Sequence, residues 1–380
     1  MSFSRWVAVV AAALSTLLDG CSTASAASTS RGASPFAVDA AWPKPLPNNW
    51  ILGQVAGIAV DASDHVWIVQ RPRSLTDDER GAALIPPVSR CCVPAPPVME
   101  FDSEGNLVQA WGGPGQGYDW PLSEHGIGVD QDGFVWIAGN GETDGQILKF
   151  TRDGRFVSQF GRPGPPTGSA DVTRFGRPAT VEVDPSTNEL YVADGYFNRR
   201  IIVLDAATGA YKRHWGAYGQ APSDAGKVVL SRPSPPPSPP PKQFGNPVHC
   251  ARLSRDGLVY VCDRINDRIQ VFRKDGTFVK ELFVEPRTAA NGSVWDIALS
   301  RDPEQRYLFV ADGRNNQVLV VRRETGEVAA TFGRPGRSAG DFHWVHDIAI
   351  DSKGNLYTGE VDTGKRVQRF LWRGQLPWPG

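Results

Sequence analysis

The chain has 380 residues, of which 41% are hydrophobic and 21% are charged, and its formal net charge is −1. This length is ample for a large core, and the near-neutral charge removes the electrostatic reason to expect nucleic acid or an anionic membrane surface as a partner. The 40 Gly, 31 Pro and 12 Trp residues favour many short strands and turns over helices.

The N-terminal segment is predicted to direct export. A basic residue precedes an apolar run at 7–18 that is too short to span a bilayer. Cleavage could occur before Cys21, where "LDGC" resembles a lipobox, or at the "ASAA" stretch of 24–27. We therefore expect a signal peptide at 1–26 and a linker at 27–34. The mature protein is expected in the bacterial periplasm or outside the cell, with a lipid anchor if Cys21 is the cleavage site and with no transmembrane segment.

A pattern of two strands joined by a turn recurs six times along the mature chain, and third and fourth strands follow most copies. The copies are "GIAVDASDHVWIV" (57–69), "GIGVDQDGFVWIA" (126–138), "TVEVDPSTNELYVAD" (180–194), "CARLSRDGLVYVCD" (250–263), "DIALSRDPEQRYLFVAD" (296–312) and "DIAIDSKGNLYTGE" (347–360). This pattern predicts an all-β fold, a six-bladed β-propeller of four-stranded antiparallel blades, over residues 35–373 with a tail at 374–380.

The last blade lacks a fourth strand of its own, because the chain ends soon after 366–372. The stretch 34–42 could supply this strand and close the ring, which would hide the free edges of the sheet. Insertions at 72–97 and 217–244 interrupt the repeat. The second contains "SRPSPPPSPPPK" (231–242), which predicts an extended loop with polyproline character. Each insertion could cover a binding site or be a tolerated surface loop.

Cysteine positions allow a disulfide between neighbouring strands. Four cysteines remain after the export segment: Cys91, Cys92, Cys250 and Cys262. If the turn at 255–257 pairs its flanking strands symmetrically, Cys250 and Cys262 face each other, and an exported protein can oxidise them. A cross-strand disulfide and two buried thiols are both open on this reasoning, and no cysteine spacing suggests a zinc finger.

Three of the six histidines occupy the same position in alternate blades, five residues before the turn residue that follows the first strand. From the first blade to the sixth, this position holds Ala56, His125, Ala179, His249, Trp295 and His346. First strands line the channel of a propeller, and alternate blades of six lie roughly 120° apart. The three imidazoles are therefore expected to converge on the axis as an open three-histidine site that suits catalytic zinc. A buried, hydrogen-bonded ring explains any single histidine but does not explain the alternation.

Polar residues recur where the second strands end: Arg71 in the first blade, Tyr196 in the third, Arg264 in the fourth and, near this point, Arg314 in the fifth. Folding does not require them, but an anionic substrate would use them. Arginine binds a carboxylate with two hydrogen bonds, and tyrosine beside a metal can transfer a proton. Arg264 could instead pair with Asp263 or Asp267. The remaining histidines, at 65, 214 and 343, are interpreted as structural.

These residues together resemble the peptidyl-α-hydroxyglycine α-amidating lyases, which are propellers of the NHL-repeat type. The resemblance extends over residues 53–370. It rests on "GQVAGIAVD" with Arg71, "HGIGVDQDG" (125–133), "VADGYFNRRI" (192–201), "PVHCARL" with "DRINDRIQVF" (247–272) and "HDIAIDSKGNLYTGE" (346–360).

The resemblance implies a role for each of these residues. Zinc would bind His125, His249 and His346. Tyr196 would take the proton of the substrate hydroxyl, Arg71 would bind the substrate carboxylate, and Arg264 would help to position Tyr196. A structural calcium ion would bind the side chain of Asp347 and the backbone carbonyls of Ile58 and Ile127. The sequence departs from the family at Trp344, where the family has Met, and at Phe197, where the family has a disulfide cysteine.

The implied function is an exported zinc-dependent lyase that cleaves an α-hydroxyglycine-type carbinolamine into an amide and glyoxylate. Its substrate would be a small anionic or peptide-like compound, and we expect a monomer. The alternative is a non-enzymatic NHL-type propeller that binds a protein or cell-envelope ligand and holds a structural metal in its channel. A calcium-dependent lactonase-type propeller is disfavoured, because its site would use carboxylate and amide oxygens instead of three imidazoles.

Overall fold

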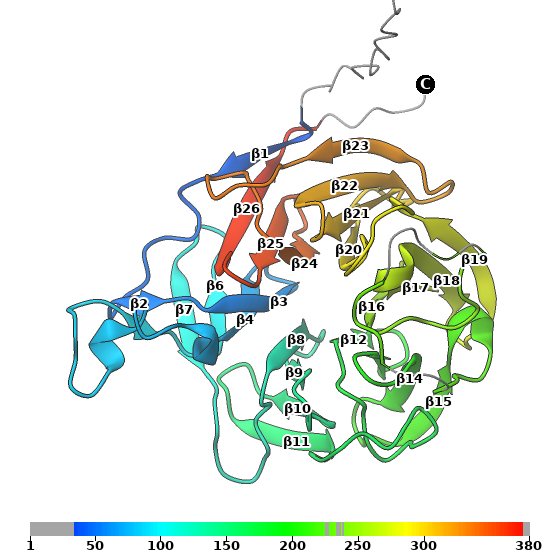
Figure 1. Ribbon diagram of the computed structural model, residues 1–380, viewed down its shortest axis with the longest axis horizontal. Coiled ribbons are helices and arrows are strands. Elements are labelled where there is room, and N and C mark those ends of the chain that lie inside the picture. Colours follow the sequence, from blue (N-terminus) through cyan, green and yellow to red (C-terminus); the bar gives the residue numbers. More distant parts are fainter. Residues whose placement is uncertain (1–33, 225–227, 233–236, 238, 375–380) are drawn as a thin grey trace, which may run out of the picture. The chain divides into compact units, whose positions relative to one another are not determined.

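Six four-stranded sheets surround a central channel in the computed structural model (Figure 1). The structure describes residues 34–374 except 225–227, 233–236 and 238. The expected signal peptide, nearly all of the linker, most of the C-terminal tail and part of the proline-rich insertion lie outside the described residues. The predicted six-bladed propeller is confirmed.

Each blade is antiparallel, and the first strand of each blade lies nearest the channel (Figure 1). The first two blades are β3 (Gln54–Val60), β4 (Val66–Arg71), β6 (Val98–Phe101) and β7 (Leu107–Trp111), then β8 (Glu124–Val129), β9 (Val135–Gly139), β10 (Gln146–Phe150) and β11 (Phe156–Gly161). The third and fourth are β12 (Thr180–Asp184), β13 (Glu189–Asp194), β14 (Arg200–Asp205) and β15 (Tyr211–Trp215), then β16 (Val248–Leu253), β17 (Leu258–Asp263), β18 (Arg268–Arg273) and β19 (Phe278–Phe283).

The fifth and sixth blades are β20 (Asp296–Leu299), β21 (Tyr307–Asp312), β22 (Gln317–Arg322) and β23 (Val328–Phe332), then β24 (Val345–Ile350), β25 (Leu356–Glu360), β26 (Arg366–Trp372) and β1 (Phe36–Asp39). Outside the blades, β2 (Trp50–Ile51) pairs in parallel with β5 (Val93–Pro94). Four short 3₁₀ helices are η1 (Pro72–Ser74), η2 (Gly81–Ala83), η3 (Ala217–Gly219) and η4 (Arg264–Asn266). No helix in the described part of the chain has the length and apolar character needed to cross a bilayer.

An aspartate, or a serine in the fourth and fifth blades, holds the turn between the first two strands, which explains why the turn recurs in the sequence. In the second blade, one oxygen of Asp130 accepts a hydrogen bond from the backbone N–H of Phe134 (2.9 Å) and the other accepts one from Trp136 Nε1 (2.9 Å). Gly133 completes the turn with a φ of +81°, which residues with a side chain rarely adopt. Asp61 holds the turn of the first blade in the same way.

Large aromatic side chains on the second strands fill the space between neighbouring blades. Each blade contributes at least one that is less than 2% exposed: Trp67, Trp136, Tyr191, Tyr260, Tyr307 and Tyr357. Because a fully buried aromatic side chain contributes a large apolar area, this ring of contacts carries much of the hydrophobic stabilisation of the propeller.

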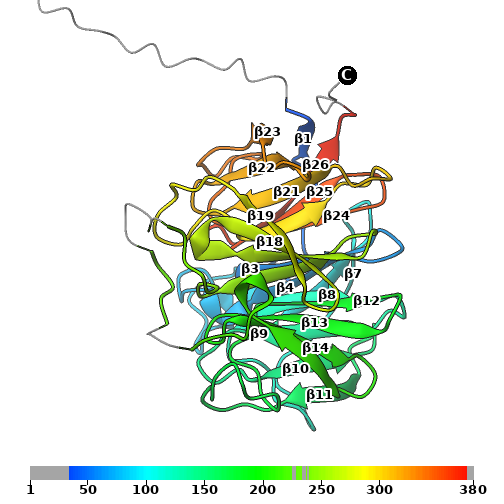
Figure 2. The ribbon, with the colours of Figure 1, turned by 90° about the vertical axis from the view of Figure 1, so that its right-hand side faces the viewer.

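The N-terminal strand closes the ring, as the sequence predicted. Strand β1 pairs with β26, from Phe36 opposite Trp372 to Asp39 opposite Arg369, and the two strands lie side by side in both views (Figures 1 and 2). Phe36 is 5% exposed, and its ring centroid lies 5.2 Å from that of Trp372 on β26. The two ends of the fold are therefore joined by both a hydrogen-bonded ladder and an apolar contact.

Of the two possibilities for Cys250 and Cys262, a disulfide or two buried thiols, the structure has the disulfide. The two residues lie directly opposite each other on β16 and β17 and are bonded. A second disulfide joins the adjacent Cys91 and Cys92 in the first insertion. Phe197, at the position of the family's disulfide cysteine, takes part in neither.

Ring closure predicts a large difference between two apolar substitutions at the seam. Phe36→Ala should lower the free energy of unfolding by about 3–5 kcal/mol, because it leaves a cavity where the first and last strands meet. Leu371→Ala, on the neighbouring strand at a side chain that is 39% exposed, is the control and should cost about 0.5 kcal/mol or less. Denaturant unfolding followed by tryptophan fluorescence measures both, and equal losses would show that β1 does not close the ring.

Candidate functional site

Each of the three histidines sits at a β-bulge in the innermost strand of its blade. The pairing register shifts between Glu124 and Ile127 in β8, between Val248 and Cys250 in β16, and between Val345 and Asp347 in β24. A bulge leaves a residue out of the ladder and re-aims its side chain. These local irregularities therefore turn the three imidazoles away from the sheet and toward the channel.

Every one of these histidines donates a hydrogen bond from Nδ1 to the backbone carbonyl at the equivalent position of the next blade. The pairs are His125 with Ala179 (2.9 Å), His346 with Ala56 (2.8 Å) and His249 with Trp295. A carbonyl only accepts, so Nδ1 carries the proton and Nε2 keeps its lone pair. The alternation seen in the sequence is thus an alternation of donors and acceptors around the ring.

The three imidazoles meet inside the channel. Their ring centroids lie 5.0 Å apart for His125 and His249, 4.7 Å for His125 and His346, and 4.8 Å for His249 and His346. Ligand nitrogens of all three lie within 4.8 Å of one another, and each residue is at most 3% exposed. Burial lowers the pKa of all three well below its usual value of 6.5, so the rings stay neutral and able to bind a metal.

Tyr196 adds a hydroxyl to this cluster. It follows β13, and its backbone N–H donates to the carbonyl of Arg177 (3.2 Å). The phenolic oxygen lies 2.9 Å from Nε2 of His125 and 3.1 Å from Nε2 of His249. Nη1 of Arg264 donates to the same oxygen at 3.4 Å. The hydroxyl is therefore placed between two ligand nitrogens and one guanidinium.

Arg264 starts η4 and packs against the aromatic wall of the site. Its guanidinium carbon lies 4.6 Å from the ring centroid of Trp295, which in turn makes an edge contact with Trp344 at 5.2 Å. Arg264 makes no ion pair with Asp263 or Asp267 within the described residues, because these carboxylates are taken by Arg268 and Arg232. The sequence-based alternative of a local ion pair for Arg264 is therefore wrong.

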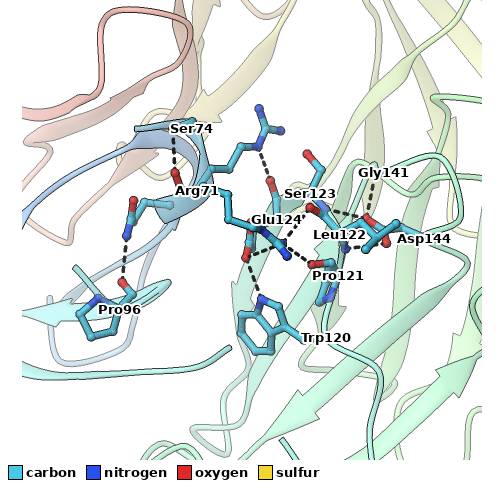
Figure 3. Close-up of polar contacts among 12 residues, drawn as sticks. Arg71, Ser74, Pro96, Trp120, Pro121, Leu122, Ser123, Glu124, Gly141 and Asp144 are labelled. Carbon is cyan, nitrogen blue, oxygen red and sulfur yellow. Dashed lines mark hydrogen bonds and ion pairs between the residues drawn. The ribbon is translucent and has the colours of Figure 1, made fainter. Parts of the chain in front are cut away.

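Arg71 is held on the other side of the cluster by neutral groups. Its guanidinium donates to the carbonyl of Glu124 (2.7 Å), to Oε1 of Gln54 (2.8 Å) and to Oδ1 of Asn140 (3.3 Å). Figure 3 shows this contact with Glu124 and, beyond it, Asp144, which accepts hydrogen bonds from the backbone N–H groups of Leu122 and Ser123 before β8 and of Gly141 after β9. Burial lowers the pKa of both Arg71 and Arg264.

The structure adds two residues that the sequence reasoning missed. The guanidinium carbon of Arg177 lies 5.9 Å from the ring centroid of Tyr196, and that of Arg264 lies 5.7 Å from the same centroid. Nε of Arg177 donates a hydrogen bond to the backbone carbonyl of Asn140 (2.8 Å). Asn140 thus links Arg177 with Arg71. No carboxylate among the described residues accepts a hydrogen bond from Arg71, Arg177 or Arg264. The site thus places guanidinium groups without ion pairs around neutral imidazoles, and the carboxylates of Glu124 and Asp144 act on Arg71 electrostatically.

Several residues considered in the sequence lie elsewhere. Arg314 is exposed and is not among the residues around the histidines. The remaining histidines have partners outside the channel: His65 contacts Glu100 (2.6 Å), His214 contacts Tyr211 (3.0 Å) and His343 contacts Asp362 (3.2 Å). Their interpretation as structural residues agrees with these contacts.

The residues assigned to calcium lie one level further along the innermost strands. Ile58 and Ile127 line a cavity of about 310 Å³ on the side of the strand turns. Asp347 lies 3.3 Å from a guanidinium nitrogen of Arg252, which lines the same cavity. The carboxylate of this expected calcium site therefore already has a cationic partner.

Curated proteins of two kinds are similar to this chain. Peptidyl-glycine alpha-amidating monooxygenase of Mus musculus is 27% identical over 328 residues, which are 82% of this chain and 30% of that protein. The chain thus spans less than a third of that relative. NHL repeat-containing protein 3 of Mus musculus is 25% identical over 362 residues, 90% of this chain and 86% of that protein.

A probable peptidyl-alpha-hydroxyglycine alpha-amidating lyase of Caenorhabditis elegans is 23% identical over 83% of this chain and 82% of its own length. A solved streptogramin B lyase has a TM-score of 0.51 and 12% identity over 90% of this chain and 98% of its own, which shows a shared fold. No protein-family model matches the sequence. The chain is therefore a homologue of both the amidating-lyase proteins and the NHL repeat proteins, and the resemblance indicated by its motifs is confirmed.

Proposed function

We propose that this protein is a zinc-dependent lyase that cleaves an α-hydroxyglycine-type carbinolamine, N–CH(OH)–COO⁻, into an amide and glyoxylate. One observation carries the proposal: His125, His249 and His346 bring their ring nitrogens together, and the Nε2 atoms of His125 and His249 contact the hydroxyl of Tyr196, beside guanidinium groups without ion-pair partners among the described residues. The relative named as a probable peptidyl-alpha-hydroxyglycine alpha-amidating lyase supports the same class of reaction.

The three histidines fit zinc by their chemistry. Three neutral imidazoles with Nδ1 held by carbonyls are the donor set that open zinc sites use, and the fixed tautomer leaves each Nε2 unprotonated, with the Tyr196 hydroxyl beside those of His125 and His249. When bound, zinc would act as a Lewis acid and lower the pKa of a hydroxyl that coordinates it.

The residues of the chain account for binding and for proton movement. Arg71 binds the substrate carboxylate with paired hydrogen bonds in exchange for its neutral partners. Tyr196 accepts the proton of the substrate hydroxyl while its own phenolic proton passes to the departing amide nitrogen. The carbon–nitrogen bond breaks and the hydroxyl oxygen becomes the aldehyde oxygen of glyoxylate, so atoms and charge balance. Arg264 orients the oxygen of Tyr196 through its hydrogen bond to it.

We further propose that the protein works in an oxidising compartment, as an exported monomer. Its two disulfides suit the periplasm or the extracellular space. Lipid attachment at Cys21 is part of this proposal, and mass spectrometry of the mature N-terminal peptide would detect it.

The first prediction concerns the chemistry of the site. His249→Ala should abolish stoichiometric zinc, and Tyr196→Phe should keep zinc but lower the rate about 10²–10⁴-fold, because it removes the group that moves the proton. The assay is glyoxylate release from an N-acyl-α-hydroxyglycine by the zinc-loaded protein. His214→Ala and Tyr211→Phe, on an outer strand, are matched controls that should keep both properties.

Zinc binding without turnover in the unaltered protein would contradict the lyase. It would favour instead the alternative of a non-enzymatic propeller, a reading that the similarity to NHL repeat-containing protein 3 also allows.

A second prediction separates binding of the carboxylate from chemistry. Arg71→Met should raise KM about 10–100-fold for a carboxylate substrate, since a hydrogen-bonded charge is lost, while kcat changes less. The methyl ester of the same substrate, a poor substrate for the unaltered protein, should show no further loss in Arg71→Met. The exposed Arg314→Met serves as control. An equal loss on acid and ester would show that Arg71 does not bind the carboxylate.

A third prediction follows from the lowered pKa of the buried histidines. As pH falls below about 6.5, these histidines bind protons in the unfolded chain but stay neutral in the folded channel, so the free energy of unfolding decreases. For metal-free protein, each histidine contributes at most about 1.4 kcal/mol per pH unit to this loss. Urea unfolding at a series of pH values should give a shallower dependence for His249→Gln than for the unaltered protein or for His343→Gln. Equal dependences in all three would contradict neutral histidines in the channel.

A further inference from the structure

A single arginine joins the inner strands of four consecutive blades. Arg252 on β16 donates from Nε and Nη2 to the two oxygens of Asp296 on β20, at 3.0 and 2.6 Å. Its Nη2 also lies 3.3 Å from Asp347 on β24, and its Nη1 lies 3.7 Å from Glu182 on β12. One guanidinium therefore contacts carboxylates from the third, fifth and sixth blades.

This cluster is buried and lies one level below the histidines. The side chains of Arg252, Asp296 and Asp347 are 14%, 1% and 3% exposed. Asp296 directly follows Trp295, and Asp347 directly follows His346, so both carboxylates start from the ring of positions that forms the candidate site. Charged groups this deep in a protein persist when each is paired and hydrogen-bonded.

The carboxylate of Asp347 is already bound by groups of the protein itself. Besides Arg252, it accepts a hydrogen bond from the backbone N–H of Ile348 (2.8 Å). The same N–H also donates to Asp296 (3.2 Å), which fixes the two carboxylates relative to each other. Arg252 supplies positive charge to both carboxylates, through a bidentate pair with Asp296 and a single contact with Asp347.

A calcium ion does not fit this arrangement. Calcium takes six to eight oxygen ligands, and carboxylates supply most of the charge that holds it. Here an ion bound by Asp347 and the carbonyls of Ile58 and Ile127 would compete with the guanidinium of Arg252 for the Asp347 carboxylate, and the two cations would repel each other. We infer that Arg252 takes the place of a structural calcium ion in this propeller, and that its guanidinium joins the blades as such an ion would.

The test uses full-length protein that has been treated with chelator and resupplied with one equivalent of zinc. Millimolar calcium chloride should leave its thermal midpoint unchanged within about 1 °C, because a ligand that binds only the folded state would raise it. Elemental analysis after gel filtration should find no stoichiometric calcium. Stoichiometric calcium, together with a calcium-dependent midpoint that disappears in Asp347→Asn, would overturn the inference.

Two arginine variants test the structural role of the guanidinium. Arg252→Met should lower the midpoint by at least about 5 °C, because it leaves buried carboxylates without a cation. Arg301→Met is the matched control, since Arg301 lines the same cavity but donates only to the backbone carbonyls of Ile350 and Asp351. Its midpoint should fall by less than half as much, and equal losses would contradict the role of Arg252. If Arg252→Met does not fold, Arg252→Lys, which keeps the charge but not the paired hydrogen bonds, replaces it in the same comparison.

Discussion

The hydrogen bond from a histidine Nδ1 to a carbonyl in the next blade is the interaction on which the site depends. It occurs three times around the ring, at His125, His249 and His346. Each bond fixes the tautomer and the direction of one imidazole, and each uses the backbone of a blade that has no histidine at the equivalent position. Six blades can therefore build a three-fold site only if donors and acceptors alternate.

The channel separates two kinds of electrostatic environment along its axis. At the level of the histidines, Arg71, Arg177 and Arg264 have no carboxylate partners among the described residues, which suits an anionic substrate. Further along the channel, toward the strand turns, Arg252 pairs with carboxylates and so connects the innermost strands of different blades. The same scaffold thus keeps positive charge available where a ligand would bind and compensates it where only the fold requires it.

Much of this could be predicted from the sequence, because the turn aspartates leave a local signature. Counting back from Asp130 and its equivalents gave both the number of blades and the register of the three histidines. The same count reaches Asp296 and Asp347, yet it cannot show that Arg252 pairs with them, because that pairing depends on how far a side chain reaches across the channel. Arg177 lies two residues before Ala179 and was missed because this register position holds other residue types in other blades, such as Trp344 before His346.

X-ray absorption at the zinc edge of the purified protein tests the central claim most directly. If three imidazoles share one ion on the channel axis, the spectrum should fit three nitrogen ligands near 2.0–2.1 Å with the multiple scattering typical of histidine. One or more oxygen ligands would complete the coordination. A sulfur ligand near 2.3 Å, fewer than two imidazoles, or no bound metal in protein prepared with zinc would contradict the account.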